Sequence, residues 1–311
     1  MSLFPDSHCT LCGTQAPHFT RFRGNLDPNK VRPQSFSPRV LKGKAHFDFQ
    51  ECGDCGILFP SPLLPESVLK ELYSDSSMEN ETLLEEEYTE LEKFIYQSYQ
   101  PILDIALRRT QSRNSFVEVG GGSGFMLRYA VERGFQEQIE LELSEAALKR
   151  FQSPSEKAKF YRQTLEESSL HSNSVSVISF FQMLDHVADP RFFLSQVLDR
   201  LEPGGVAVCV VHDTSALPTR ILGARSPILN VCHNYLFNPK NLSRLFEQVG
   251  FQEITAFPIA NQYPIWYWLY LLPLPTKLKS FLNGVLNFTK CNSLPIRLFA
   301  GNFCVIASKE P

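Results

Sequence analysis

The sequence has no apolar run long enough to cross a bilayer as a helix. Its longest apolar stretch lies near residues 263–274 and is broken by Pro264 and Pro273, whereas a spanning helix needs about 20 residues. The first eight residues also contain no basic segment followed by an apolar one, which a signal peptide requires. We therefore expect a cytoplasmic protein whose thiols stay reduced.

The chain also lacks a strong excess of charge of either sign. Its net charge is −3, which argues against general nucleic-acid binding. The charge is uneven, however: residues 66–93 hold ten acids against two lysines, and residues 261–311 hold five bases against one acid. Residues 1–50 carry seven bases against three acids, so recognition of nucleic acid by this segment is kept only as an alternative.

No internal repeat or low-complexity segment interrupts the 311 residues, a length that suits about two domains of ~150 residues each. With 43% hydrophobic residues the chain can bury a substantial core. Shifts in composition and periodicity divide it into a cysteine- and proline-rich start, a helical connector, a core of alternating elements, and a C-terminal part. The expected boundaries are 1–62, 63–112, 113–260 and 261–311.

From residue 115 onward, strand-like and helix-like segments alternate, which favours an α/β fold with a parallel sheet covered on both faces. The strand segments are apolar throughout, as burial on both faces requires. The predicted strands are 116–119, 138–141, 159–162, 175–181, 205–211, 251–257 and 302–308. The predicted helices are 83–109, with a kink or break at Pro101, and 123–133, 144–151, 190–201 and 238–249.

Two Cys-x-x-Cys pairs, each followed by glycine, stand in the first segment: Cys9 with Cys12, and Cys52 with Cys55. Together they supply four thiolates, a complete tetrahedral shell for Zn²⁺, and a closed shell makes the metal structural rather than catalytic. Redox-active pairs are the alternative, but the strand–helix context of a redox pair is absent. The same segment also contains three histidines, any of which could replace a cysteine as a zinc ligand: His8, His18 and His46.

A glycine-rich loop follows the first strand of the core, with Gly120, Gly122 and Gly124 at Gly-x-Gly-x-Gly spacing. Glycines here let the backbone turn tightly and approach a ligand closely. Phe125 occupies the third position after Gly122, so the dinucleotide pattern Gly-x-Gly-x-x-Gly fails. The spacing therefore points away from NAD and toward S-adenosylmethionine (SAM).

The second strand ends on Glu142, 22 residues after Gly120. A carboxylate in that place can accept hydrogen bonds from both ribose hydroxyls. Glu140 is a competitor, but Glu142 lies nearer the strand tip; helix capping is the alternative role for Glu142. After the third strand, the segment from Gln163 to Glu166 is placed to border an adenine.

These pieces together resemble the class I SAM-dependent methyltransferases. The glycine loop matches the family's first motif, LDHVADP (184–190) is similar to its LEHVxDP, and LEPGG (201–205) is similar to its LKPGG. The segment HNYLFNPKNLSRLFEQVGF (233–251) resembles the family's late helix and sixth strand, and GNFCVIASKEP (301–311) its final strand. The resemblance implies a Rossmann-like, mostly parallel sheet of seven strands, with the last two forming a reversed hairpin.

The N-terminal half resembles the zinc ribbon that precedes the methyltransferase domain in a bacterial subgroup. Members of that subgroup methylate nucleotide-linked sugars or related small metabolites. The resemblance therefore implies methyl transfer to a small, sugar-like acceptor, such as a nucleotide sugar or surface-glycan precursor. Two alternatives stay open: a protein or nucleic-acid methyltransferase that reads its target with the ribbon, and a non-catalytic SAM-binding protein.

Carried over residue by residue, the resemblance assigns Gly120, Gly122 and Gly124 to the methionine part of SAM. It assigns Glu142 to the ribose, Thr164 and Leu165 to the adenine, and Gln182 to the neighbourhood of the sulfonium. Asp185 departs from the family's glutamate by one methylene.

Methyl transfer to a hydroxyl or an acidic carbon needs a base, and histidine suits neutral pH. His186, His212 and His233 all lie near predicted carboxyl-end loops. For His186 a backbone-bonded, loop-orienting role is favoured. His212 or His233 is the preferred base, with Tyr235 as a further candidate and Asp213 as a residue that could orient His212.

The segment from Tyr263 to Leu272 holds both tryptophans of the chain, and Lys277 and Lys279 follow. Packing as a lid or a dimer contact is the favoured interpretation, because apolar stripes usually face a core. The alternative is a helix at the membrane surface, through residues 263–280. The oligomeric state stays open.

Overall fold

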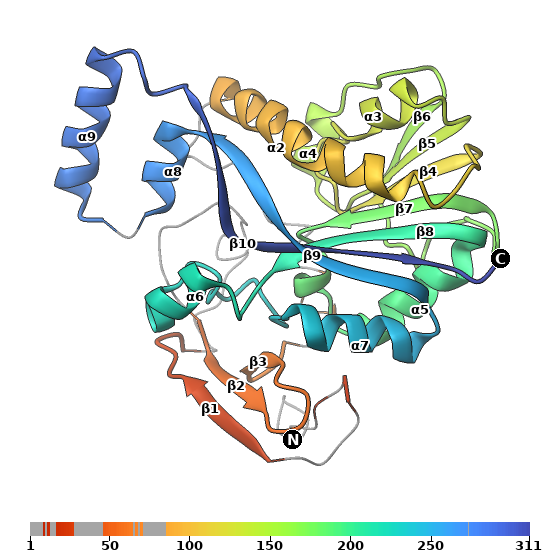
Figure 1. Cartoon of the computed structure of the whole chain (residues 1–311), viewed down its shortest axis with the longest axis horizontal. Helices are drawn as coiled ribbons and strands as arrows, with labels where there is room; N and C mark the ends of the chain where they lie inside the picture. The colour runs from red at the N-terminus through yellow and green to blue at the C-terminus, as the bar shows by residue number, and fades with distance from the viewer. Residues whose placement is uncertain are drawn as a thin grey trace.

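The computed structural model describes residues 9, 11–12, 17–27, 46–64, 66–67, 69–70, 85–272 and 274–311. His8 and the predicted start of the first long helix at Leu83 lie outside the described residues. The described part holds a small three-stranded sheet and a larger sheet flanked by helices (Figure 1).

The larger sheet has seven strands in the order β6-β5-β4-β7-β8-β10-β9 within the described residues. Every pairing from β6 to β8 is parallel, and β10 runs antiparallel to both β8 and β9. This confirms the predicted seven-stranded, mostly parallel sheet with its reversed final hairpin. The strands are β4 (Ser115–Val119), β5 (Glu137–Leu141), β6 (Ala158–Tyr161), β7 (Val175–Phe181), β8 (Leu201–His212), β9 (Gln252–Pro264) and β10 (Pro295–Ser308).

The last two strands are much longer than the sequence predicts. Their pairing extends from Gln252↔Ser308 at one end to Pro264↔Pro295 at the other, with an irregularity between Leu298 and Asn302. Only the half of β10 beyond Gly301 is buried, because there it pairs with β8 as well as β9. The outer half is solvent-exposed although Ile296, Leu298 and Phe299 are apolar. Pro295 and Arg297 interrupt its apolar residues, and no strand is expected there from the sequence.

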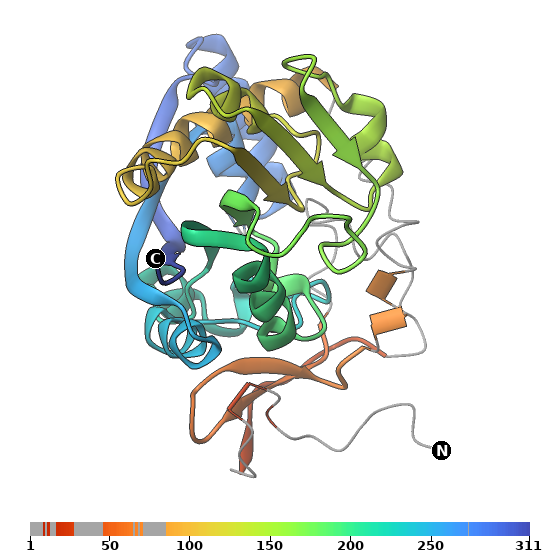
Figure 2. The same cartoon turned by 90° about the vertical axis from the view of Figure 1, so that its right-hand side faces the viewer.

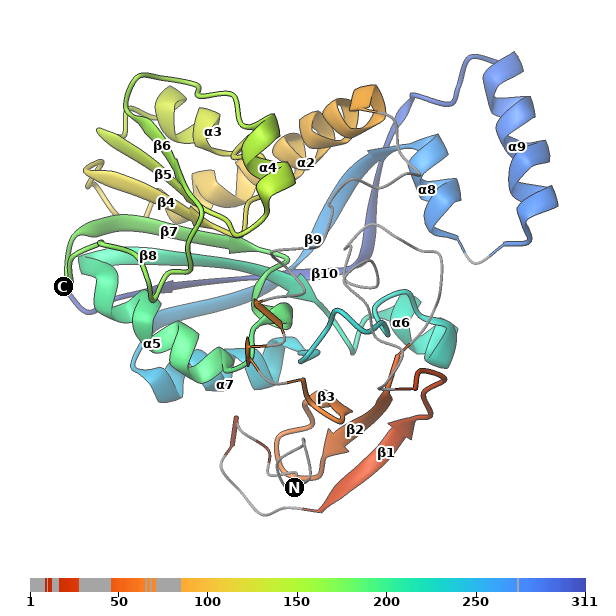
Figure 3. The ribbon, with the colours of Figure 1, turned by 180° about the vertical axis from the view of Figure 1, so that it is seen from behind.

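Helices cover both faces of the sheet (Figures 1 and 3). One buried cluster joins the sheet to α2 and α3, and another joins the opposite face to α5 and α7. The helices are α2 (Glu85–Ala106), α3 (Leu127–Glu132), α4 (Glu145–Arg150), α5 (Pro190–Arg200), α6 (Leu217–Leu222), α7 (Pro239–Val249), α8 (Ile265–Leu271) and α9 (Thr276–Phe288), with short 3₁₀ turns η3 (Leu184–His186) and η4 (Gly223–Arg225).

Caps in the sequence set several of these helix starts. Asp189 accepts from the Phe192 amide at the start of α5, and proline occupies the first position of that helix. Asn238 and Asn241 form a reciprocal capping box on α7, which Gly250 ends in the left-handed conformation. Helix α2 continues through Pro101, so the break considered from the sequence does not occur.

The N-terminal segment forms an antiparallel sheet of β1 (His18–Phe22), β2 (Asp48–Cys52) and β3 (Leu58–Ser61). Figure 2 shows it below α5 and α7. Ile57 and Phe59 belong to the same buried cluster as Tyr235, Phe237 and the α7 side chains. The small sheet therefore shares a hydrophobic core with the larger unit.

Helices α8 and α9 extend from the outer end of the β9–β10 hairpin, away from the sheet (Figure 1). Helix α8 buries Leu269, whereas α9 buries none of its residues. Of the helices in the described residues, none is long and apolar enough to span a membrane.

Candidate active site

The glycine loop follows β4, and its backbone N–H groups donate hydrogen bonds to acidic side chains at the end of β5. Gly120, Gly122 and Gly124 have φ angles of +73°, +72° and +73°, a region that side chains with a Cβ rarely adopt. A Cβ on Gly120 would also come within 2.7 Å of Met183 Cγ. The loop therefore needs glycine both for its path and for its close approach to the segment after β7.

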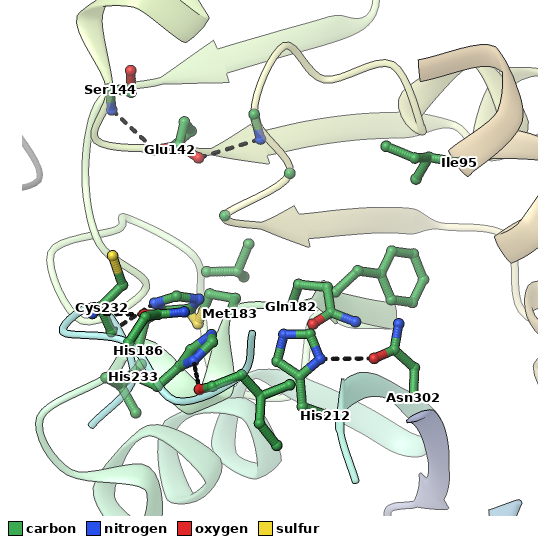
Figure 4. A pocket seen from close by; sticks show the side chains of 18 of the residues that line it. Ile95, Glu142, Ser144, Gln182, Met183, His186, His212, Cys232, His233 and Asn302 are labelled. Atoms are coloured by element: carbon green, nitrogen blue, oxygen red, sulfur yellow. Dashed lines mark hydrogen bonds between the residues drawn. The ribbon is translucent and has the colours of Figure 1, made fainter. Parts of the chain in front are cut away.

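Glu140 and Glu142 each accept a hydrogen bond from this loop. The Gly121 amide donates to Glu140 Oε1 at 2.8 Å, and the Gly122 amide donates to Glu142 Oε2 at 3.2 Å. Glu142 Oε1 accepts from the Ser144 amide at 2.9 Å. Glu142 lines the large cavity of the protein, while Glu140 is fully buried and does not. The geometry thus favours Glu142 as the residue available to a ligand (Figure 4).

A third carboxyl, Glu118, lies under the same loop. A Cβ on Gly121 would come within 2.3 Å of its Cδ atom, so the loop packs directly on this side chain. Burial, together with the charge of Glu142, raises the pKa of Glu118 to about 8, although an interaction with Glu140 acts to lower it. Burial and the charge of Glu118 likewise raise the pKa of Glu140. At neutral pH this pair therefore retains a proton.

Thr164 and Leu165 lie where the sequence places them, in the loop after β6, and both line the cavity. Thr164 and Glu167 exchange two hydrogen bonds, each backbone amide donating to the other's side-chain oxygen at 3.1 and 3.2 Å. Lys70 of the N-terminal connector donates to Glu167 at 3.1 Å. The connector therefore contacts and stabilises the loop that is expected to border the adenine.

Gln182, directly after β7, has a φ angle of +53°, strained for a residue with a side chain. Its amide donates to Val210 O at 2.7 Å, which holds the backbone in this turn. The side chain lines the cavity on the side of His212 (Figure 4). Strain of this kind concentrates at ligand sites, and it fits the expectation that Gln182 faces the reacting group.

His186, His212 and His233 converge on one wall of the cavity (Figure 4). The ring centroids of His186 and His233 are 4.7 Å apart, and those of His212 and His233 are 5.0 Å apart. Each Nδ1 atom meets an oxygen acceptor: Cys232 O at 2.8 Å for His186, Asn302 Oδ1 at 2.8 Å for His212, and Ile228 O at 2.6 Å for His233. Each Nδ1 therefore carries the proton in the neutral ring, and each Nε2 carries the lone pair.

The three Nε2 atoms face the carboxylate of Asp185. The Nε2–oxygen distances are 3.7 Å for His186, 4.0 Å for His212 and 3.6 Å for His233. Asp185 is completely buried, and neither carboxylate oxygen has a hydrogen-bond donor among the described residues. Burial acts to raise the pKa of Asp185, but the three histidines bring it below its ordinary value. Burial lowers the pKa of His212, and that of His233 to about 3.

Two expectations about this wall need correction. Asp213 does not orient His212, because its Oδ1 atom accepts from the backbone amide and hydroxyl of Ser215. Asn302 on β10 takes that role, and it donates in turn to Asn261 Oδ1 at 3.0 Å. Tyr235 does not line the cavity; it is buried, with its hydroxyl 3.4 Å from Ala188 O.

The sequence interpretation missed Asp185 and Asn302 as parts of the site. Asp185 is adjacent to His186 in sequence, but its approach to His212 and His233 depends on the pairing of β7 with β8 and on the 226–237 loop. Asn302 is 90 residues from His212 and reaches it through the antiparallel β8–β10 register, in which the two residues are directly paired. No local pattern marks either contact.

One cavity of about 1250 Å³ is lined by the donor-side residues and by the residues of the histidine wall: Glu142, Thr164, Leu165, Gln182, His186, His212, His233 and Asn302. Asp185 is buried behind the histidines. Figure 4 shows Glu142 and the glycine loop on one side and the histidines across from them. Tyr267, Trp268 and Tyr270 of α8 complete the lining, together with Arg225 and Lys279. The predicted C-terminal aromatic segment therefore borders the cavity through α8.

The four cysteines of the small sheet come together as a separate cluster. The Sγ atoms of Cys9 and Cys55 are 3.6 Å apart, as are those of Cys12 and Cys52, and all four lie within 4.8 Å of one another. Thiolates bound to one tetrahedral Zn²⁺ at ~2.3 Å are separated by roughly 3.8 Å. The residues present therefore fit a zinc ion, with His18 and His46 outside the cluster.

A mostly parallel sheet with a glycine loop after β4 and a carboxylate at the tip of β5 defines a Rossmann-like protein that binds a nucleoside at the carboxyl ends of its strands. Residues 91–256, more than half of the chain, match the family described as "Methyltransferase domain", and the chain belongs to this family. It is an S-adenosylmethionine-dependent methyltransferase.

Similar folds occur among solved methyltransferase structures. A SAM-dependent methyltransferase from Archaeoglobus fulgidus has 18% identity and a TM-score of 0.48, covering 71% of this chain and 99% of that one. One from Mesorhizobium loti has 18% identity and a TM-score of 0.45, covering 68% and 98%. Phosphoethanolamine N-methyltransferase 2 from Haemonchus contortus has 14% identity and a TM-score of 0.49, covering 82% and 62%. No curated protein matches the sequence significantly.

Proposed function

We propose that the protein transfers a methyl group from SAM to a small, sugar-like acceptor, with a nucleotide sugar or a related glycan precursor as the substrate class. The observation that carries this proposal is one cavity with two chemically different walls, the glycine loop with Glu142 on one and the histidine cluster on the other. Its volume of about 1250 Å³ exceeds the ~300–1,000 Å³ of an ordinary ligand pocket. It therefore has room for both a donor and an acceptor.

The residues on the first wall would hold the donor. Glu142 would accept from the ribose hydroxyls, Thr164 and Leu165 would border the adenine, and the glycine loop would lie against the methionine part. SAM supplies a methyl group already activated by its sulfonium. The protein's own tasks are then to align the acceptor and to exclude water.

The residues on the second wall suit a hydroxylated acceptor. Aromatic side chains from α8 offer faces on which a sugar ring can lie, and Arg225 and Lys279 bring positive charge for phosphate oxygens. The histidine cluster is placed to take up the proton that the acceptor loses. Of its members, His212 has the most exposed side chain, 25% against 15% for His186 and 5% for His233.

Variants of Glu142 test the donor site. Because a hydrogen bond to a charged group contributes about 1.5–3 kcal/mol, we expect Glu142→Ala to weaken SAM binding roughly 100-fold, measured by calorimetry. Glu142→Gln keeps one acceptor oxygen and should fall between this variant and the wild type. The matched control is Glu145→Ala, which removes an exposed carboxylate at the first position of α4 that pairs with Lys149. Unchanged affinity in Glu142→Ala would contradict the assignment.

The acceptor class is tested separately, by incubating the wild-type protein with SAM and a panel of nucleotide sugars and following substrate mass. Addition of one methyl group to a panel member supports the proposal. Binding of SAM with transfer only to protein or nucleic acid would contradict the acceptor class while leaving the donor site intact.

We propose two further features that depend on the same chain. The four-cysteine cluster holds a structural Zn²⁺, because its closed shell leaves no position for a substrate. The exposed face of α9 contacts an anionic membrane surface: Phe281 and Phe288 are 67% and 90% exposed there, and residues 254–309 contain no acid. Such a location would bring the enzyme near lipid-linked glycan precursors.

A further inference from the structure

The hydrogen bonds of the histidine cluster place acceptor atoms opposite one another, with no cation between them among the described residues. His186, His212 and His233 each direct an Nδ1–H group to an oxygen, so their Nε2 lone pairs point toward Asp185. Lone pairs therefore face a carboxylate across 3.6–4.0 Å. Acceptors facing one another in a buried site repel unless a cation lies between them.

Protonation of one of the histidines does not account for this geometry. A charge-assisted hydrogen bond between imidazolium and carboxylate measures about 2.7–2.9 Å, shorter than each of the three separations. Asp185 is fully buried with both oxygens lacking a donor among the described residues.

A divalent metal ion fits the same geometry. The ligand atoms of Asp185, His212 and His233 lie within 4.8 Å of one another. Two ligands at ~2.1 Å from a shared ion are roughly 3.0–3.4 Å apart at octahedral or tetrahedral angles. The separations of 3.6 and 4.0 Å between Asp185 and the two histidines must therefore close by about 0.2–1.0 Å when the ion binds. The Nδ1–H groups of His212 and His233 donate to oxygen atoms. Histidines that bind a metal through one nitrogen commonly donate their other N–H group to an oxygen in the same way.

We infer that Asp185, His212 and His233 form a divalent transition-metal site in the wall of the active-site cavity, distinct from the four-cysteine cluster. Two imidazoles and one carboxylate suit Zn²⁺, Fe²⁺, Co²⁺ or Ni²⁺ and leave coordination positions open. Because His212 and His233 also line the cavity, an open position can face an oxygen of the acceptor. His186 stays outside this ligand set, and with the Nε2 atoms of His212 and His233 bound to the ion, these two rings would no longer take up the proton of the acceptor.

The role of such an ion rests on the proposed function, whereas its binding does not. An ion bound to an acceptor hydroxyl would lower the pKa of that hydroxyl and fix its direction of approach. It would thereby favour acceptors with a hydroxyl or enolate oxygen over amines, and a vicinal pair of oxygens could occupy two open positions. The inferred ion thus narrows the acceptor class to oxygen ligands.

Cobalt titration of the full chain tests the site without SAM or an acceptor. After metal removal with a chelator, Co²⁺ bound to four thiolates gives intense charge-transfer absorption, whereas Co²⁺ bound to nitrogen and oxygen gives only weak ligand-field bands. We expect both signals in the wild type and two cobalt ions per chain by elemental analysis. Asp185→Asn should lose the weak bands and one ion, and keep the thiolate absorption.

Two further variants separate ligation from folding. Asn302→Leu removes the partner of His212 Nδ1 and should weaken the second Co²⁺ roughly 10–100-fold, while His171→Gln removes an exposed histidine elsewhere and should change nothing. Each variant must bind SAM like the wild type, which shows that it is folded. The inference is overturned if the wild type binds only thiolate-ligated cobalt, or if Asp185→Asn retains both ions with unchanged affinity. Methyl transfer in either case would leave the proposed function standing.

Discussion

At the scale of single residues, three carboxyl side chains lie against the glycine loop. Glu140 and Glu142 accept from successive glycine amides, and Glu118 packs beneath Gly121. Their shared burial raises the pKa of all three. The backbone amides offset only part of this effect, so Glu118 and Glu140 together carry a proton at neutral pH. Glu118 and Glu142 both line the cavity, whereas Glu140 does not.

This arrangement makes the stability of the fold depend on pH. The pKa of Glu118 is about 8 in the folded protein against an ordinary 4.5, so the folded state binds more protons than the unfolded state between these values. Its contribution is fully present below pH 4.5 and is lost as the pH rises through 8. We expect the free energy of unfolding to fall from pH 5 to pH 8. Glu118→Gln should reduce that slope by up to about 1.4 kcal/mol per pH unit.

Denaturant unfolding of wild type and variant at a series of pH values measures these slopes. Glu137→Gln, at an exposed position on β5, is the matched control and should keep the wild-type slope. Equal slopes in wild type and Glu118→Gln would show that Glu118 is ionised in the folded protein.

Local patterns predicted those site residues whose roles follow from their neighbours in the chain. The glycines at 120, 122 and 124 and the acid at 142 lie at strand ends, and parallel pairing of β4 with β5 brings strand ends together. The four cysteines belong to two short motifs with a known preference for one metal. Asp185 and Asn302 could not be found in this way, because their contacts depend on the folded register of β7, β8 and β10.

At the scale of elements, the C-terminal aromatic segment divides into two helices with different surroundings. Helix α8 places Tyr267, Trp268 and Tyr270 in the cavity lining. Helix α9 instead leaves Leu278, Phe281, Val285 and Phe288 exposed along one side. Their spacing of three and four residues was visible in the sequence, but apolar spacing alone does not say whether another part of the chain covers the helix.

A membrane-binding experiment addresses the proposed role of α9. Burial of a phenylalanine side chain contributes about 1.5–3 kcal/mol, so Phe281→Glu with Phe288→Glu should lower partitioning onto phosphatidylserine vesicles at least tenfold. Neutral phosphatidylcholine vesicles should bind the wild type more weakly, because the bases near α9 meet no lipid charge there. Co-sedimentation gives the bound fraction.

Leu148→Glu provides the control, since Leu148 is an exposed apolar residue on α4. Equal partitioning of the double variant and this control would contradict membrane contact. So would a wild type that ignores both vesicle types and sediments as a dimer that the double variant does not form, which would assign the face to a second copy of the chain.

At the scale of the whole molecule, the small N-terminal sheet of β1, β2 and β3, called the ribbon below, supports the histidine wall of the active site. Phe49 and Leu58 of the ribbon pack against Ile228 and Leu229, and Leu58 pairs with Leu236 through two backbone hydrogen bonds. These contacts flank His233, whose Nδ1 atom is bonded to Ile228 O. Composition marked the ribbon as a separate segment, but it could not show that its core is continuous with the larger unit.

Loss of the Zn²⁺ proposed for the four-cysteine cluster should therefore affect the histidine wall of the cavity and leave the wall of the glycine loop unchanged. Cys52→Ser with Cys55→Ser removes half of the proposed zinc ligands. We expect the unfolding midpoint to fall by roughly 5 °C or more, protease cleavage within residues 226–237 to increase, and methyl transfer to decrease. SAM affinity should change little, because none of the described residues among 9–62 lines the cavity beside the glycine loop. Cys291→Ser, outside the cluster, is the control. If the double variant lost SAM binding and acceptor turnover in equal measure, the ribbon would be supporting the whole domain rather than the histidine wall.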